Sequence, residues 1–245
     1  MKKKILHFCG VKFFDVNYKF ILRLLNKKKG YLVMPAASSL VDLGKNIKYT
    51  NALRNSTAAI LDSGLLCLLI KIFKFCNVKK FSGYKFINLF LNDSFIKNKK
   101  VLLLNSSIKS EKINYVFLKS KKFLNFRSYI CPVYNNRNIV DQKLFNIINI
   151  YKPEIIIINI GGGIQELLAY EIKKNVKNKM IIICSGAAIS FFTGEQVKIG
   201  KIFDYLYLGW LKRFLNNPKQ YYPRVVKSLN LIKIFYKNKI RISYI

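Results

Sequence analysis

The sequence predicts an α/β fold: a Rossmann-like, mostly parallel sheet flanked by helices and followed by a basic, aromatic C-terminal appendage. Residues 155–160 and 180–184 each have the length and apolar composition of a buried strand, and each runs into a turn of small residues. The first turn, Gly161-Gly162-Gly163, leads into a helix that we expect to begin near Gln165. Two strand–glycine turns about one helix apart predict strand ends that line a cleft.

The rest of the chain supplies strands and helices in alternation. Residues 1–30 predict a strand, a polar turn and a short basic helix or strand. Further strands are predicted at residues 31–34, 57–61, 101–104 and 114–118. Helices are predicted at residues 38–49, with Ser38 or Ser39 as the cap, at residues 65–75 and at residues 139–149. We expect residues 1–194 to form the α/β core and residues 195–245 to form the appendage, which is not an independent domain.

Length and composition limit the class of protein. A chain of 245 residues is long enough for one α/β domain with its own core. Its apolar runs are far shorter than the ~20 residues of a membrane span. The N-terminus resembles the start of a signal peptide, but Lys12, Asp15 and Lys19 interrupt its apolar stretch, so we predict no export. Five cysteines without a C-x-x-C pair indicate reduced thiols in a cytoplasmic protein.

The chain is strongly basic. It carries 44 Lys and Arg against 11 Asp and Glu, a formal net charge of +33, and part of this excess accompanies the abundance of Lys, Asn and Ile that an AT-rich genome produces. A surface so positive is attracted to anionic lipid headgroups and to nucleic acid alike, and composition does not separate these partners. No recognisable nucleic-acid module is present in the sequence, so a basic nucleic-acid-binding protein is the weaker alternative, and we expect no specific nucleic-acid partner.

The glycine turn by itself is a weak signal. Glycines between a strand and a helix let backbone N–H groups and the helix N-terminus face an anionic ligand such as a diphosphate. However, residues 161–166 do not match G-x-G-x-x-G, and no G-K-[ST] follows them. A tight turn that needs only a positive φ explains the glycines equally well.

Three blocks in order make the signal more specific. Residues 161–166 read GGGIQE, residues 186–194 read GAAISFFTG, and residues 208–214 read LGWLKRF, followed by Asn217-Pro218-Lys219 and Arg224. They resemble, in order and separation, the G-x-P-[KR]-Q-E, G-[AG]-x-F-D-F-x-x-G and G-L-E-W-L-x-R-L-x-x-E-P-x-R blocks of the WecG/TagA/CpsF family of bacterial glycosyltransferases. The chain is therefore identified as a divergent member of that family.

The chain also departs from the family pattern. The resemblance covers about residues 30–228 and is strongest in the C-terminal half of the chain. Ser190 stands where the family has an aspartate, and Gly209 stands where it has a glutamate. In the N-terminal half, Met34 and Ala36 stand where the family has a threonine and an asparagine. Because of these changes the resemblance does not identify the particular sugars, and an inactive relative is the alternative.

Asp62 is the predicted general base. It follows the apolar residues 58–61, which places it at the carboxyl end of a strand, where ligands bind in open α/β sheets. A partly desolvated carboxylate there would accept the proton of a sugar hydroxyl as that oxygen attacks an anomeric carbon. The resemblance points to the same residue, because Asp62-Ser63-Gly64 keeps the aspartate of the family's D-G-x-G turn. The alternative for this carboxylate is an Asx turn or a helix N-cap.

Four residues are predicted to bind the nucleotide donor. Gly161 and Gly186 are backbone positions that let the donor approach closely, and the amide of Gln165 is expected to bind its base or sugar. Glu166 opens the same helix beside Gln165. Its alternative role is that of a carboxylate that stabilises the first helical turn, and both roles are compatible.

Arg213, Lys219 and Arg224 are the predicted contacts of phosphate groups. Cleavage of a nucleotide sugar builds negative charge on a diphosphate, which guanidinium groups offset when no metal is present. The same side chains would alternatively bind the pyrophosphate of a lipid-linked acceptor or form a solvated basic face. Aromatic residues alternate with cations from residue 205 onwards, as in an interfacial amphipathic helix, and a helix docked on the core is the alternative.

The chemistry that the resemblance implies is specific. It is the inverting, metal-independent transfer of a sugar, often N-acetylmannosamine, from a UDP-sugar to a polyprenyl-diphosphate-linked acceptor, in the synthesis of teichoic acid or another cell-surface polysaccharide. The sequence agrees in having no D-x-D pair and a lone histidine, His7, so we predict no metal site and no cofactor. We expect a cytoplasmic protein, peripheral on the inner face of the cell membrane, with a homo-oligomer as an open possibility. The alternative is a catalytically degenerate homologue that acts as a binding or scaffold subunit.

Overall fold

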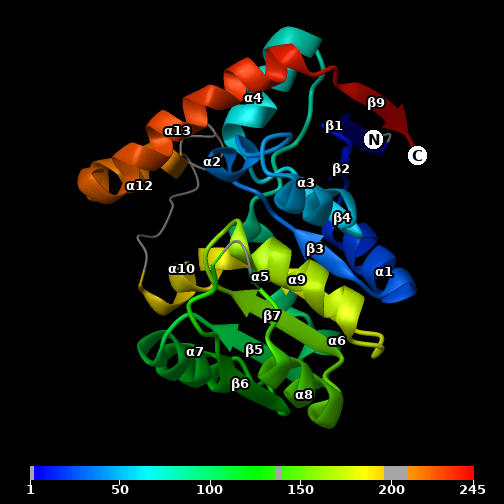
Figure 1. Cartoon of the computed structure of the whole chain (residues 1–245), viewed down its shortest axis with the longest axis vertical. Coiled ribbons are helices and arrows are strands. Elements are labelled where there is room, and N and C mark those ends of the chain that lie inside the picture. The colour runs from blue at the N-terminus through cyan, green and yellow to red at the C-terminus, as the bar shows by residue number, and fades with distance from the viewer. Residues whose placement is uncertain (1–2, 136–138, 196–208) are drawn as a thin grey trace.

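The computed structural model describes residues 3–135, 139–195 and 209–245, with the backbone alone at residues 209, 210, 212, 213 and 220. Its strands form one nine-stranded sheet in the order β6-β5-β7-β8-β3-β4-β2-β1-β9, flanked by helices (Figure 1). The strands are β1 Lys4–Phe8, β2 Val11–Asp15, β3 Tyr31–Val33, β4 Ala58–Ile60, β5 Val101–Asn105, β6 Phe126–Ile130, β7 Ile155–Asn159, β8 Ile181–Cys184 and β9 Arg241–Tyr244. The predicted α/β class with a mostly parallel sheet is confirmed.

The sheet is parallel from β6 to β2 and antiparallel only where β1 pairs with β2 and with β9. Its two halves meet where β3 pairs with β8: one contains β5 to β8, and the other contains β1 to β4 together with β9. Strands β5, β7 and β8 are buried along their whole length. This burial on both faces explains why their sequences are almost uninterrupted apolar runs rather than alternating patterns.

The helices lie on both faces of the sheet. They are α1 Tyr18–Lys28, α2 Ala37–Leu40, α3 Ile47–Arg54, α4 Gly64–Lys74, α5 Gly83–Asn92, α6 Ser94–Lys97, α7 Ile108–Ser120, α8 Gln142–Tyr151, α9 Ile164–Asn175, α10 Ser190–Thr193, α12 Gly209–Asn216 and α13 Pro218–Lys237, with a 3₁₀ turn η1 at Gly186–Ala188. One face packs on residues of α3, α4, α8, α9 and α13, and the other packs on residues of α1, α5, α6 and α7. Within the described ranges, no helix combines the length and the apolarity that crossing a bilayer requires.

Several helix starts are encoded locally. The side chains of Asn17, Asn46, Ser63, Ser82 and Ser107 each accept a hydrogen bond from a backbone N–H in the first turn of the following helix. Such caps satisfy one of the N–H groups that a helix leaves unpaired at its beginning. These short polar residues therefore position α1, α3, α4, α5 and α7 against the sheet.

Two of the expected elements differ in the structure. The strand expected at residues 114–118 is wrong, because these residues belong to α7, where the Nδ2 of Asn114 donates to the Oδ1 of Asn105 at 2.9 Å. The edge strand beside β5 is instead β6. The helix expected at residues 38–49 is interrupted, and its second part, α3, is capped by Asn46 rather than by Ser38 or Ser39.

The end of the chain is integrated into the fold. Strand β9 pairs with β1 at the edge of the sheet, and Leu231, Ile234 and Phe235 of α13 are buried. The ring of Phe235 lies 6.3 Å from that of Phe8 and 6.0 Å from that of Phe73 on α4. These contacts do not confirm the predicted C-terminal appendage, because residues 231–244 complete both the sheet and one of its helical layers.

Candidate functional site

The turns that the sequence analysis selected lie at the carboxyl ends of the parallel strands. Asp62 follows β4, Gly161 follows β7 and Gly186 follows β8, while Met34 follows β3 between β4 and β8. Because parallel strands end at a common edge, these turns lie along one side of the sheet. In open α/β sheets ligands bind at this carboxyl edge, near the point where the chain changes direction across the sheet.

Asp62 joins the end of β4 to the beginning of α5. Its Oδ1 accepts a hydrogen bond from the backbone N–H of Gly83 at 2.7 Å. The helix that follows it, α4, is capped by Ser63, whose Oγ accepts the N–H of Leu66 at 3.1 Å. The alternative of an N-cap at Asp62 is therefore wrong: the neighbouring serine caps α4, and the partly buried carboxylate is directed towards a residue 21 positions later in the chain.

The start of α5 is packed tightly against other parts of this edge. A Cβ at Gly83 would lie 3.3 Å from the Sδ of Met34 and 3.7 Å from the Oδ1 of Asp62. The next residue, Tyr84, stacks on Phe192 with ring centroids 4.7 Å apart and meets Phe191 edge-on at 5.8 Å. The fold thus brings the block at residues 186–194 onto the helix that Asp62 holds.

The two glycine turns are connected through Gln165. The Oε1 of Gln165 accepts the backbone N–H of Gly186 at 2.7 Å, and its Nε2 donates to the Oε1 of Glu166 at 3.1 Å. Gly186 has a φ of +54°, and a Cβ there would lie 3.3 Å from the Nε2 of Gln165. Gln165 is only 4% exposed, and both of its described side-chain hydrogen bonds are to other residues of this chain. Its contact with a donor stays a prediction.

Glu166 has the structural role that was its alternative. Its Oε2 accepts the backbone N–H of Gly163 at 2.7 Å, which satisfies a free N–H at the start of α9. Complete burial raises the pKa of the carboxyl group, while the hydrogen bonds from Gly163 and Gln165 act in the opposite direction. Glu166 therefore stabilises the glycine turn through the N–H of Gly163. A contact between Glu166 and the donor stays a prediction.

Three asparagines belong to this edge that sequence reasoning did not select. Asn105 and Asn159 end the neighbouring strands β5 and β7 in register, and both are buried. Asn114 of α7 donates to Asn105. Within the described residues, the Oδ1 atoms of Asn114 and Asn159 have no hydrogen-bond partner. Buried unpaired acceptors are rare and destabilising, so these atoms are candidates for ligand contacts. In the sequence, Asn105 and Asn159 could have been found as asparagines that end an apolar strand, whereas nothing local marks Asn114.

The predicted phosphate contacts are not gathered at this edge by any described interaction. The side chain of Arg213 lies outside the described residues. Lys219 and Arg224 are exposed on α13, where the guanidinium of Arg224 lies over the ring of Tyr221 at 5.5 Å from the centroid. Their roles stay predictions. Among the residues described, no group of three His, Cys, Asp or Glu side chains lies close enough to hold a metal ion.

Comparison with protein families gives a match over nearly the whole chain. The model of the glycosyl transferase WecG/TagA/CpsF family matches residues 6–243, from β1 to β9. A search of curated proteins found no significant match. The family match includes the turns of Asp62, Gly161 and Gly186, and it extends through the C-terminal helix and strand that complete the sheet.

Proposed function

Because the chain belongs to the glycosyl transferase WecG/TagA/CpsF family, we propose that it transfers an N-acetylmannosamine-like sugar from a UDP-sugar to a polyprenyl-diphosphate-linked acceptor. Glycosyl transfer in the synthesis of a cell-surface polysaccharide follows from the family. The donor, the acceptor, the inversion of configuration and the independence from metal and cofactor are the proposal. It locates the reaction at the carboxyl edge of the sheet.

The single observation that carries the proposal is the position of Asp62. The residue follows a central strand, and the N–H of Gly83 holds one of its carboxylate oxygens. As a general base, the carboxylate accepts the hydroxyl proton of the acceptor sugar while the acceptor oxygen forms a bond to the anomeric carbon. The bond from that carbon to the β-phosphate oxygen breaks on the opposite face, so the configuration inverts and UDP leaves with the bonding electrons.

The donor is proposed to lie across the two glycine turns. The N-terminus of α9 and the turn at Gly161 face the diphosphate, since backbone N–H groups at a helix start favour anions. Gln165 acts as a positioning residue, because its amide bridges the turns that receive the donor. The unpaired oxygens of Asn114 and Asn159 accept hydrogen bonds from hydroxyl or N–H groups of the donor.

The acceptor and the leaving group require cations and a membrane surface. Arg213, Lys219 and Arg224 are proposed to offset the charge of the diphosphate that leaves or of the acceptor pyrophosphate. The exposed Tyr222, together with these cations, suits contact with an anionic bilayer. The protein would then act on the cytoplasmic face of the membrane as a peripheral enzyme.

The test is release of UDP from a panel of UDP-sugars in the presence of membranes and without divalent metal. We expect release that depends on the lipid acceptor and that falls by about 10²–10⁴-fold in Asp62→Asn. The matched control is Asp15→Asn, because Asp15 also ends a strand of this sheet and accepts a backbone N–H, from Lys79 at 3.3 Å. This control should retain turnover. Equal losses in both variants would contradict the role of Asp62.

The alternative of a non-catalytic homologue has one specific observation in its favour. Met34 stands where the family has a threonine, and its side chain is buried against Gly83 beside the Asp62 carboxylate. If a folded protein releases no UDP with any donor and binds UDP-sugar weakly or not at all, the chain is a binding or scaffold subunit. Restoring the hydroxyl with Met34→Thr would then be the first variant to assay for a gain of turnover.

A further inference from the structure

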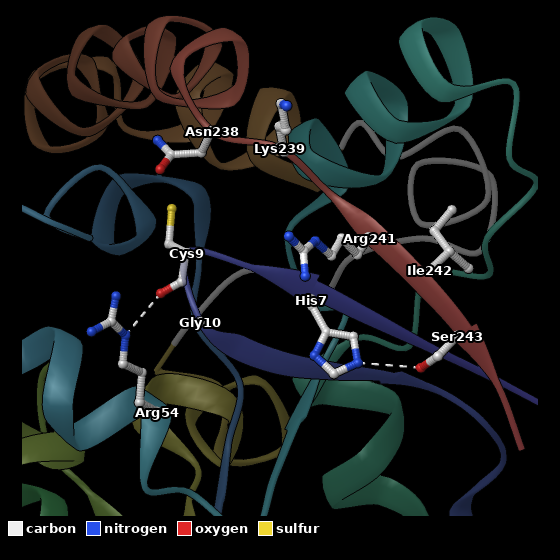
Figure 2. A pocket seen from close by; sticks show the side chains of 9 residues that line it. All are labelled: His7, Cys9, Gly10, Arg54, Asn238, Lys239, Arg241, Ile242 and Ser243. Carbon is white, nitrogen blue, oxygen red and sulfur yellow. Dashed lines mark hydrogen bonds between the residues drawn. The ribbon is translucent and has the colours of Figure 1, made fainter.

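A cavity lies at the opposite edge of the sheet from Asp62. It has a volume of about 740 Å³ and is formed by the β1–β2 turn, the end of α3 and the connection from α13 into β9 (Figure 2). Gly10 precedes β2 and Arg54 ends the helix before β4, whereas Asp62 follows β4. The cavity is therefore at the amino edge and is separate from the proposed substrate site. Its volume is in the range of small-molecule sites.

The lining of this cavity is positive. Of its nine lining residues, none is a carboxylate, and the three permanent cations are Arg54, Lys239 and Arg241. The register of β1 and β9 places His7 directly opposite Arg241, so that both side chains project from the same face of the sheet. A concave surface lined by one sign of charge concentrates the field and attracts ligands of the opposite sign.

Arg54 is held in place by the β1–β2 turn. Its Nε donates to the carbonyl oxygen of Cys9 at 2.9 Å, as Figure 2 shows. Cys9 and Gly10 have φ values of +50° and +81°, the conformation of a two-residue hairpin turn. A Cβ at Gly10 would lie 2.6 Å from the Nε of Arg54, so glycine permits both the turn and the close approach of the guanidinium. This hydrogen bond uses Nε and leaves the two Nη groups as donors.

The other polar groups of the lining are also oriented. The Nε2 of His7 lies 3.2 Å from the Oγ of Ser243, and that Oγ donates to the carbonyl of Ile5 at 3.4 Å. The direction of the contact between His7 and Ser243 depends on the imidazole tautomer, and in either direction it orients both side chains. The imidazole of His7 and the hydroxyl of Ser243 are therefore fixed by hydrogen bonds beside Arg241, and together they form a polar part of the cavity lining.

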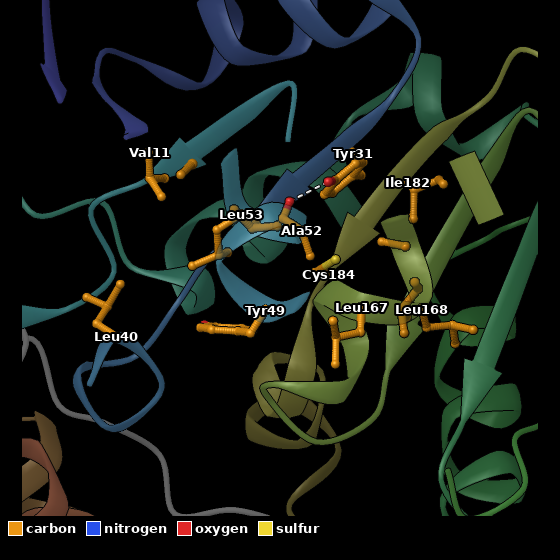
Figure 3. Packing of buried hydrophobic residues seen from close by; sticks show 14 of the residues in the cluster. Val11, Tyr31, Leu40, Tyr49, Ala52, Leu53, Leu167, Leu168, Ile182 and Cys184 are labelled. Atoms are coloured by element: carbon orange, nitrogen blue, oxygen red, sulfur yellow. Dashed lines mark hydrogen bonds between the residues drawn. The ribbon is translucent and has the colours of Figure 1, made fainter. Parts of the chain in front are cut away.

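A simpler explanation for these cations would be compensation of the two helix ends that meet here, since C-terminal carbonyls attract positive charge. Several of those carbonyls have other partners. The carbonyls of Asn51, Ala52 and Leu53 in α3 accept hydrogen bonds from Asn55, Tyr31 and Ser56, and Figure 3 shows the bond from Tyr31 to Ala52. At the end of α13, the carbonyl of Ile234 accepts from the Nδ2 of Asn238 at 2.8 Å. No described hydrogen bond joins Arg54, Lys239 or Arg241 to a carbonyl of either helix end, so these cations are available to a ligand.

We propose that this amino-edge cavity binds a phosphate-bearing small molecule, with Arg54, Arg241 and Lys239 as its contacts to the phosphate groups. Guanidinium groups match phosphate oxygens in geometry as well as in charge. The cavity is larger than a single phosphate ion needs, so the ligand carries a further moiety or a second phosphate. The inference does not depend on the proposed glycosyl transfer, because it uses none of the residues at the carboxyl edge.

The test titrates the full chain with inorganic pyrophosphate and follows the backbone amide signals of Gly10 and Ser243 by ¹H–¹⁵N NMR. We expect saturable shifts of both signals and a loss of affinity of at least about tenfold in the double variant Lys239→Gln/Arg241→Gln. The matched control, Lys119→Gln/Lys143→Gln, removes the same charge from exposed positions on α7 and α8 and should bind as the unmodified chain does.

Two results would overturn the proposal. One is an equal loss of affinity in both double variants, which would indicate general attraction to a basic surface. The other is a pyrophosphate titration that shifts the signals of Gly161 and Gly186 but not those of Gly10 and Ser243. Vesicles of phosphatidylglycerol in phosphatidylcholine then identify the source of the phosphate. Weaker vesicle binding by Lys239→Gln/Arg241→Gln than by the control indicates a lipid headgroup, and equal vesicle binding indicates a soluble ligand.

Discussion

At the carboxyl edge of the sheet, Asp62 and Glu166 each accept the backbone N–H of a neighbouring turn, whereas at the amino edge Arg54, Lys239 and Arg241 line a cavity. The carboxylates are partly or completely buried, and their hydrogen bonds connect segments of backbone. The cations are exposed. In a chain of net charge +33, both of these acidic residues have specific backbone partners, whereas of the three cations only Arg54 has a described hydrogen bond, to the carbonyl of Cys9. The two edges of the sheet therefore differ in burial as well as in charge: the proposed catalytic edge contains buried or partly buried carboxylates, and the proposed anion site contains exposed cations.

The largest expected effect is on turnover. Asp62→Asn should lower kcat by about 10²–10⁴-fold, because the amide does not accept a proton, while its oxygen still accepts the N–H of Gly83. The midpoint of thermal unfolding should stay close to that of the unmodified chain. Initial rates of UDP release and a melting curve on the same preparation measure both quantities. A large drop in melting temperature would show that the carboxylate is structural.

The next effect is on stability at the bridge between the glycine turns. Gln165→Leu removes the partners of the Gly186 N–H and of one Glu166 oxygen, so the free energy of unfolding should fall by about 1–3 kcal/mol. Urea denaturation measures this change. Gln142→Leu is the matched control, since Gln142 also lies in the first turn of a helix but is exposed, and it should change stability by less than about 0.5 kcal/mol. Equal changes in the two variants would show that the bridge contributes nothing specific.

A pair of glycine variants isolates the contact of Arg54 at the amino edge. Gly10 and Gly44 have similar φ values of +81° and +79°, but a Cβ at Gly44 meets nothing within 4 Å. Both alanine variants should lose about 1 kcal/mol from the left-handed backbone. Gly10→Ala should lose about 1 kcal/mol more, because the methyl group displaces Arg54 from the carbonyl of Cys9. Chemical denaturation compares the two, and an identical loss would mean that Arg54 is not held as described.

The smallest effect is a dependence of stability on pH. Burial raises the pKa of Glu166 above its ordinary value of 4.5. Below that value the carboxyl is protonated in the folded and the unfolded chain, and as pH rises the unfolded chain loses its proton first. The free energy of unfolding should therefore fall from about pH 4.5 up to the raised pKa and then level off. Glu166→Gln should show a smaller fall over this window in urea titrations, and parallel curves for both proteins would contradict the effect.

Much of the fold and part of the site could be predicted because they depend on local patterns. The apolar runs that became β5, β7 and β8 are buried on both faces, which is why they are recognisable without alternation. The position of Asp62 at a strand end also followed from the run before it. Residues 114–118 were misread as a strand because their apolar content does not distinguish a strand from a helix face, and the hydrogen bond from Asn114 to Asn105 depends on packing.

The sequence by itself determined the α/β class, the parallel sheet, the turns at Asp62, Gly161 and Gly186, and the family, because strand composition, glycine placement and ordered blocks are properties of the chain. Only the tertiary structure decided which groups form hydrogen bonds with each other across the fold. It paired the Asp62 carboxylate with the N–H of Gly83 and joined two turns through Gln165. It also brought the last strand beside the first, which creates the cavity between Arg54 and Arg241. These contacts link residues from 21 to more than 200 positions apart, and hydrogen bonds over such separations depend on how the sheet is ordered rather than on any local pattern.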